Sequence, residues 1–179
     1  MTKNKHFFLF LILLCFIDLI SINCGKKGKV SKEVERLKSS DPLERADAAD
    51  ELRRLGKNAS TAIPFLLELL DDSNELRWVQ KSDVAMPYAG TRTSPGQEAA
   101  RALAEIGKPA INPLINALNN KNLTVQKNVA YALGKIGKPA VEALFEELKN
   151  KKSKISELVI INVIKSIRNK NALKALINI

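Results

Sequence analysis

Cysteine and histidine, two residue types that serve as nucleophiles, bases and zinc ligands, are confined to the first 24 residues of this chain. Its two cysteines are Cys15 and Cys24, and its single histidine is His6. The rest of the chain therefore has no internal disulfide, no Cys/His zinc site and no histidine base. It also carries no Gly-rich phosphate loop, no paired-carboxylate motif and no serine nucleophile elbow. The sequence thus predicts a protein that is not an enzyme, with no catalytic residues, no cofactor and no bound metal.

The first residues predict an export signal. A basic start, "MTKNKH", precedes the apolar run Phe7–Ile17. This order, and a run of this length, are typical of a secretory signal peptide. A transmembrane helix needs about 20 predominantly apolar residues, whereas Asp18 interrupts this run and charges resume at Lys26. A membrane-spanning signal anchor is the alternative that the pattern leaves open.

The hexapeptide "LISINC", which ends at Cys24, resembles a bacterial lipobox, where signal peptidase II cleaves before a lipid-modified cysteine. Ser21 and Asn23 stand where that motif prefers a leucine and a small residue. The resemblance implies lipidation of Cys24, and several acyl chains would anchor the mature protein stably. Gly25 replaces the aspartate that retains lipoproteins in the inner membrane, which favours the outer membrane. The expected segments are a signal peptide over 1–23 and a lipid anchor with a flexible basic tether over 24–39.

Beyond the tether the chain repeats itself. The pentapeptide "IGKPA" occurs at Ile106–Ala110 and again at Ile136–Ala140. An apolar stripe at helical spacing precedes each glycine, in the sets Ala49/Leu52/Leu55, Ala100/Leu103/Ile106 and Ala130/Leu133/Ile136. A second stripe follows each glycine, in the sets Ile63/Leu66/Leu67/Leu70, Ile111/Leu114/Ile115/Leu118 and Val141/Leu144/Phe145/Leu148. This spacing predicts paired helices, each first helix closing at a left-handed glycine and beginning at caps such as Asp41 and Ser94.

Paired helices that recur at about 30 residues around Ala-x-x-Leu-x-x-Ile-Gly resemble the short HEAT-like repeats of bacterial proteins, the type shared by bilin lyases. The resemblance implies an all-α fold, a solenoid of about three and a half HEAT-like hairpins over 40–179. Ile155–Ile167 supplies the first helix of a degenerate fourth hairpin. Its β-branched residues would also suit a strand, but the register of the repeat favours a helix. Stacked repeats of this kind mostly bind other macromolecules, so the resemblance implies a binding role.

An insertion over 74–93 interrupts the repeat between its first and second hairpins. Insertions in repeat proteins fall on one face, which is often the binding face. This one holds residue types that are enriched in interface hot spots, namely Arg77, Trp78, Tyr88 and Arg92. The alternative is that the insertion folds back onto the solenoid, with Trp78 filling a gap between hairpins.

The second helices of HEAT-like hairpins usually line the concave surface, and here they predict a neutral to acidic groove. Equivalent positions in successive copies place the following candidate partner-binding residues on that surface: Glu68, Asn112, Asn116, Glu142 and Glu146. A nucleic-acid groove would instead present lysine and arginine to phosphates. The formal net charge of +10 therefore does not by itself predict nucleic-acid binding, and the predicted groove argues against it.

Together these observations predict a non-catalytic scaffold that binds an envelope protein or peptide and is held at the membrane by its N-terminal lipid. The alternative function is that of a signal-anchored or cytosolic HEAT-repeat protein with a regulatory or nucleic-acid role. The sequence does not name the partner.

Overall fold

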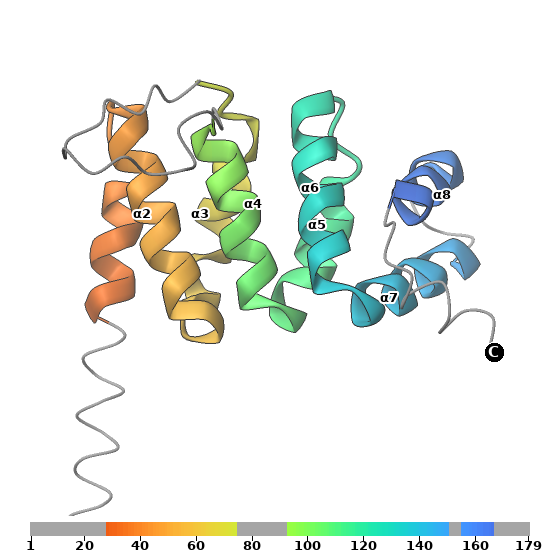
Figure 1. Ribbon diagram of the computed structural model, residues 1–179. Helices are drawn as coiled ribbons and strands as arrows, with labels where there is room; N and C mark the ends of the chain where they lie inside the picture. The colour runs from red at the N-terminus through yellow and green to blue at the C-terminus, as the bar shows by residue number, and fades with distance from the viewer. Residues whose placement is uncertain (1–27, 75–92, 151–154, 167–179) are drawn as a thin grey trace, which may run out of the picture.

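A computed structural model describes residues 28–74, 93–150 and 155–166 of the chain. Every regular element in those ranges is an α-helix or a 3-10 helix, and successive helices stack as hairpins in two layers (Figure 1). The prediction of an all-α solenoid is confirmed. Cys24 and most of the insertion over 74–93 lie outside the described residues, so the predictions for them stay predictions.

Three hairpins are described in full, and each has a longer first helix. The first helices are α2 (Pro42–Leu55), α4 (Pro95–Ile106) and α6 (Leu123–Ile136). The second helices are α3 (Ile63–Glu68), α5 (Ile111–Ala117) and α7 (Lys138–Lys149). Short 3-10 segments join or extend them, at η1 (Gly56–Ala62), η2 (Leu69–Asp71) and η3 (Lys108–Ala110). Helix α8 (Glu157–Ser166) follows the third hairpin, which confirms the helix expected there. The segment expected to complete a fourth hairpin lies outside the described residues.

The first helices begin at side-chain caps. Asp41 accepts a hydrogen bond from the backbone N–H of Leu43, and Ser94 accepts one from that of Gln97. Asn122 does the same for Thr124 at the start of α6. Each cap satisfies a backbone donor that has no partner inside its helix. The predicted starts at Asp41 and Ser94 are confirmed, and α6 adds a third of the same kind.

The first helices end at glycines, as predicted, but in a different conformation. Gly56, Gly107 and Gly137 have φ angles of 53°, 79° and 79°, with ψ angles of −129°, −131° and −135°. This is not the left-handed helical conformation that the sequence suggested. A side chain is strained at these φ angles, which explains why glycine recurs at each helix end.

One continuous aliphatic core runs between the two layers. The fully buried residues include Leu52, Leu103 and Leu133 of the first helices and Leu66, Leu114 and Leu144 of the second helices. They belong to the predicted apolar stripes, and each hairpin buries its stripe against its neighbours. The core explains the recurrence of the sequence, because a single hairpin could not cover its own apolar face.

The folded region begins earlier than the sequence analysis placed it. Residues 28–36 are helical, and Val30, Val34 and Leu37 are buried in the core cluster. The expectation of a flexible tether over 24–39 is therefore wrong for residues 28–39. The apolar spacing of those three residues was present in the sequence, but the surrounding lysines obscured it.

A single register position of the first helices has a different role in each hairpin. Eleven residues before the closing glycine stand Arg45, Gly96 and Gln126. Arg45 forms an ion pair of 2.6 Å with Asp72, and Gln126 donates a hydrogen bond of 2.8 Å to the carbonyl of Asn120. At Gly96 the backbone of 69–72 approaches so closely that there is no room for a side chain.

Within the described ranges, no helix combines the length and the apolar character that crossing a membrane requires.

Candidate binding cleft

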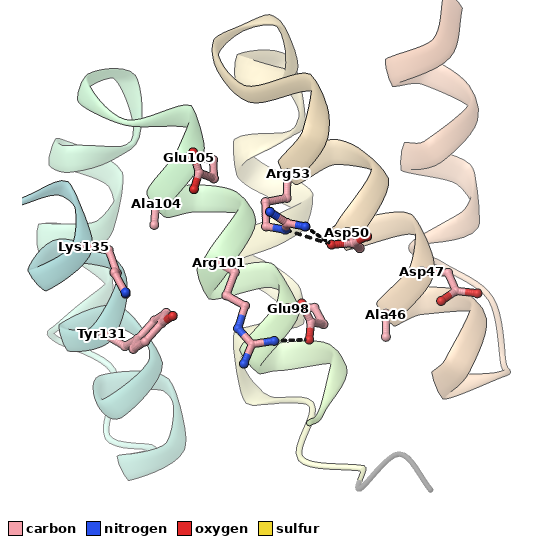
Figure 2. A pocket seen from close by; sticks show the side chains of 10 residues that line it. All are labelled: Ala46, Asp47, Asp50, Arg53, Glu98, Arg101, Ala104, Glu105, Tyr131 and Lys135. Atoms are coloured by element: carbon pink, nitrogen blue, oxygen red, sulfur yellow. Dashed lines mark hydrogen bonds and ion pairs between the residues drawn. The ribbon is translucent and has the colours of Figure 1, made fainter. Parts of the chain in front are cut away.

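A cleft of about 500 Å³ opens on the face formed by the first helices (Figure 2). It runs from α2 across α4 to α6. Its walls are mostly charged, with one aromatic ring and two alanines, and its lining consists of Ala46, Asp47, Asp50, Arg53, Glu98, Arg101, Ala104, Glu105, Tyr131 and Lys135.

Successive hairpins supply the lining from equivalent positions. Six residues before each closing glycine stand Asp50, Arg101 and Tyr131, one from each first helix. Two residues before the glycine, Glu105 of α4 and Lys135 of α6 also line the cleft. Because equivalent positions of parallel repeats fall on the same face, the stacking of the hairpins assembles this surface.

Ion pairs within the helices hold the arginines of the cleft in place. The Arg53 guanidinium contacts Asp50 at 2.7 Å, and the hydrogen bond that it donates to the Asp50 carboxylate raises the pKa of Arg53. One turn of α4 brings Arg101 into a pair with Glu98. Figure 2 shows both pairs along the walls of the cleft. Each arginine therefore presents a partly compensated positive charge in a defined position.

Glu98 is the most buried charged residue of the cleft, with 8% of its surface exposed. Burial raises the pKa of its carboxyl, because removal from water disfavours the charged form. The nearby charge of Arg101 opposes this rise. The protonation of Glu98, which lies between α2 and α4, therefore depends on two opposing effects, its burial and the charge of Arg101.

Tyr131 supplies the aromatic surface of the cleft. It lies on α6 with 42% of its surface exposed, and the ammonium of Lys135 lies 5.8 Å from the centre of its ring. An exposed tyrosine gives a binding surface both apolar area and a hydroxyl group. Lys135 adds a positive charge that, among the described residues, has no carboxylate partner.

The chemistry of the cleft is that of a binding surface. Its four carboxylates, on Asp47, Asp50, Glu98 and Glu105, lie among three cations, those of Arg53, Arg101 and Lys135. Nowhere in the described ranges do three Asp, Glu, His or Cys residues gather as metal ligands would. Charges of both signs suit an extended polypeptide, whose backbone and side chains offer donors and acceptors together.

The second-helix residues predicted to bind a partner lie elsewhere. Glu68, Asn112, Asn116, Glu142 and Glu146 are all exposed on α3, α5 and α7. None of them lines the cleft, and the insertion residues Arg77, Trp78, Tyr88 and Arg92 lie outside the described residues. The assignment of these nine residues to a binding surface therefore stays a prediction.

Sequence reasoning did not identify the cleft. A signal was nevertheless present, because the position six residues before each glycine holds a charged or aromatic side chain in all three copies. Only the packing of α2, α4 and α6 shows that these side chains face a common hollow.

Comparison with known proteins supports the repeat assignment. Residues 96–156, which contain the second and third hairpins, match the family model described as HEAT repeats. An engineered protein of known crystal structure is 24% identical over 83% of this chain and 67% of its own, with a TM-score of 0.37. That likeness is too distant to bear on how the hairpins are arranged. No curated protein matches the sequence. The matched repeats and the paired helices around them support a HEAT-like repeat protein.

Proposed function

We propose that this protein is a non-catalytic scaffold that binds an envelope protein or peptide and is anchored as a lipoprotein through Cys24. The observation that carries the binding role is the cleft, which three consecutive hairpins build from equivalent positions. Repeat solenoids bind partners along such continuous surfaces. The match to HEAT repeats fits a role in protein interaction.

The cleft suits an extended segment that carries charges of both signs. Glu105 and Asp47 are exposed and have no ion-pair partner among the described residues, so they are available to basic groups of a ligand. Lys135 and the outer edge of Arg101 are available to acidic groups. The exposed ring of Tyr131 in the same cleft provides apolar contact area, and ordering a tyrosine side chain costs little conformational entropy.

Photo-crosslinking can determine which face binds. We would introduce p-benzoylphenylalanine at Tyr131 in the cleft, at Asn116 on the second-helix surface and at Tyr88 in the insertion. We expect a discrete crosslinked product from position 131, reduced by the charge reversal Arg101→Glu. A product from position 116 or 88 alone would place the partner on the surfaces predicted from the sequence and contradict the cleft.

The anchoring rests on the leader sequence and has its own test. The intact mass of protein extracted from native membranes should match residues 24–179 plus acyl chains. The variant Cys24→Ser should lose that modification. A mass equal to the full unmodified chain would contradict lipidation and favour the signal-anchor alternative, while leaving the binding role to be decided by the crosslinking.

A further inference from the structure

A lysine follows the closing glycine of each first helix. Lys57, Lys108 and Lys138 occupy this position in the three hairpins, and all three are exposed. The turns that carry them lie along one edge of the molecule, the lower edge in Figure 1. The first described turn of the helix over 28–36 lies at the same edge, and Lys29 in it is also exposed. We call these four residues the lysine edge.

The positive charge of the lysine edge is largely uncompensated. Among the described residues, Lys57 and Lys108 have no ion-pair partner. Lys138 lies 3.7 Å from Glu142, and both side chains are more than half exposed. Such a pair is weak, because water screens it. Only Lys29 has a closer partner, Glu51 at 3.1 Å.

The opposite edge differs in character. The first helices start there, and it carries the caps Asp41 and Asn122 together with Asp71 and Asn120. Helix dipoles explain part of this division, because carboxylates are favoured at helix N-termini and cations at C-termini. The dipoles do not neutralise the lysines. The molecule therefore presents a positively charged edge opposite one that is neutral to acidic.

The chain also enters the fold at the lysine edge. The apolar run Phe7–Ile17 and Cys24 both precede Gly28, the first residue that the structure describes. The four peptide links between Cys24 and Gly28 can span at most about 14 Å, even when fully extended. A lipid at Cys24 would therefore hold this edge close to a bilayer, and an uncleaved signal anchor ending at Ile17 would tether the same edge through a connection of at most about 40 Å.

We propose that the lysine edge lies against an anionic lipid surface, so that the solenoid stands on the membrane with its cleft facing sideways. This rests on the membrane attachment in the proposed function, but not on which anchor provides it. The surface charge of anionic lipids attracts basic residues, and each lysine near it contributes roughly a fivefold gain in affinity. The attraction falls off within a screening length, so the short connection to Gly28 is essential.

Lysine acetylation on vesicles tests the orientation. The full chain would be reconstituted into vesicles of phosphatidylcholine alone or of an equimolar mixture with phosphatidylglycerol, and its flotation confirmed. Labelling is then quantified by mass spectrometry at Lys57, Lys108 and Lys138, with Lys38 and Lys121 as exposed reference lysines toward the opposite edge. We expect roughly fivefold slower labelling of the lysine edge on phosphatidylglycerol vesicles only, lost at about 1 M salt, where the screening length is ~3 Å.

Two double variants with the same net charge test whether the position of the lysines, rather than the total charge of the protein, determines the protection. Lys57→Glu/Lys108→Glu should abolish the protection of Lys138, whereas Lys38→Glu/Lys121→Glu, with the same change in net charge, should retain it. Equal labelling of both edges on anionic vesicles, or equal effects of the two variants, would overturn the proposal. Failure to float would instead contradict membrane attachment itself, and the intact mass identifies the anchor independently.

Discussion

At the scale of single residues, Glu98 of the cleft makes the stability of the fold depend on pH. Its carboxyl is almost buried between α2 and α4 and pairs with Arg101. Burial nevertheless raises its pKa above the ordinary value of 4.5. The folded protein therefore binds a proton at Glu98 at a higher pH than the unfolded chain does. Stability arising from this group is greatest at low pH and is lost as pH rises from 4.5 through the raised pKa.

We predict that Glu98→Gln removes this dependence. Thermal unfolding of the wild type and the variant should be compared across the mildly acidic range. The difference in melting temperature should shift in favour of the variant as pH rises, because the amide has no charge to desolvate. A difference that is constant with pH would show that Glu98 titrates alike in the folded and unfolded chains. Glu44, whose pKa is lowered mainly by a hydrogen bond from Ser39, is unchanged in both proteins and cancels in the comparison.

A second prediction at this scale concerns the effect of a side chain at Gly96 on stability. A Cβ at this position would lie 2.8 Å from the carbonyl oxygen of Asp72 and 2.9 Å from that of Leu70. Both are backbone atoms, so relief requires α4 to move away from η2. Gly96→Ala should therefore cost about 1–3 kcal/mol in the free energy of unfolding, measured by urea denaturation.

Gly28→Ala is the matched control, because nothing described lies within 4 Å of a Cβ there. It also lies within a helix, where alanine is the better helix former. Equal losses for the two variants would show that the close approach at Gly96 does not limit stability.

At the scale of elements, the ion pair between Arg45 and Asp72 connects α2 to the residues that follow η2 at the end of the first hairpin. Both side chains are largely buried, with 14% and 10% exposed. The guanidinium also donates to the carbonyls of Ser39 and Ser40. In the third hairpin Gln126 makes the corresponding carbonyl contact without a charge. The same register position thus anchors the preceding loop by two different chemistries.

We predict that Arg45→Ala lowers the free energy of unfolding by about 3 kcal/mol, because it leaves the carboxylate of Asp72 without its cation. Arg45→Gln should lose less, since its amide can retain carbonyl contacts as Gln126 does. Chemical denaturation measures both. The exposed Arg54 serves as a control, and Arg54→Ala should change stability by about 0.5 kcal/mol or less. Equal effects of Arg45→Ala and Arg54→Ala would contradict a structural role for the buried pair.

At the scale of the whole molecule, each hairpin is stabilised mainly by its neighbours. Helix α4 packs against both α2 and α6, whereas α8 packs against α6 and α7 at the end of the described stack. The buried amide of Asn128 also reaches back from α6 to the carbonyl of Leu70, at 2.8 Å. A central defect should therefore spread through the solenoid, and a terminal defect should stay local.

Hydrogen exchange on two core variants tests this. Leu103 and Ile160 are both fully buried, and replacing either by alanine should cost about 2–5 kcal/mol locally. Leu103→Ala should reduce the protection of amides in α2, α4 and α6 together. Ile160→Ala should reduce it in α8 and leave α2 protected. An identical loss of amide protection along the whole chain in both variants would indicate a single cooperative unit rather than a stack of coupled hairpins.

The local pattern of the sequence was sufficient to predict the class of fold and most helix ends. Apolar residues at helical spacing, with a glycine after each first helix, specify hairpins because each stripe must be buried and each end must turn. The caps Asp41 and Ser94 and the helical register of α8 followed from the same short-range rules. The helix over 28–36 was missed because its apolar residues stand among lysines, and only their contact with the core reveals them.

Tertiary structure alone decided where side chains of different hairpins meet. The cleft and the lysine edge both consist of residues that look like ordinary solvated positions in the sequence. Asp50, Arg101 and Tyr131 are brought to one hollow only because α2, α4 and α6 stack in register. Lys57, Lys108 and Lys138 form one edge for the same reason. A one-dimensional sequence records the spacing within each repeat, whereas the packing between repeats determines which faces become continuous surfaces.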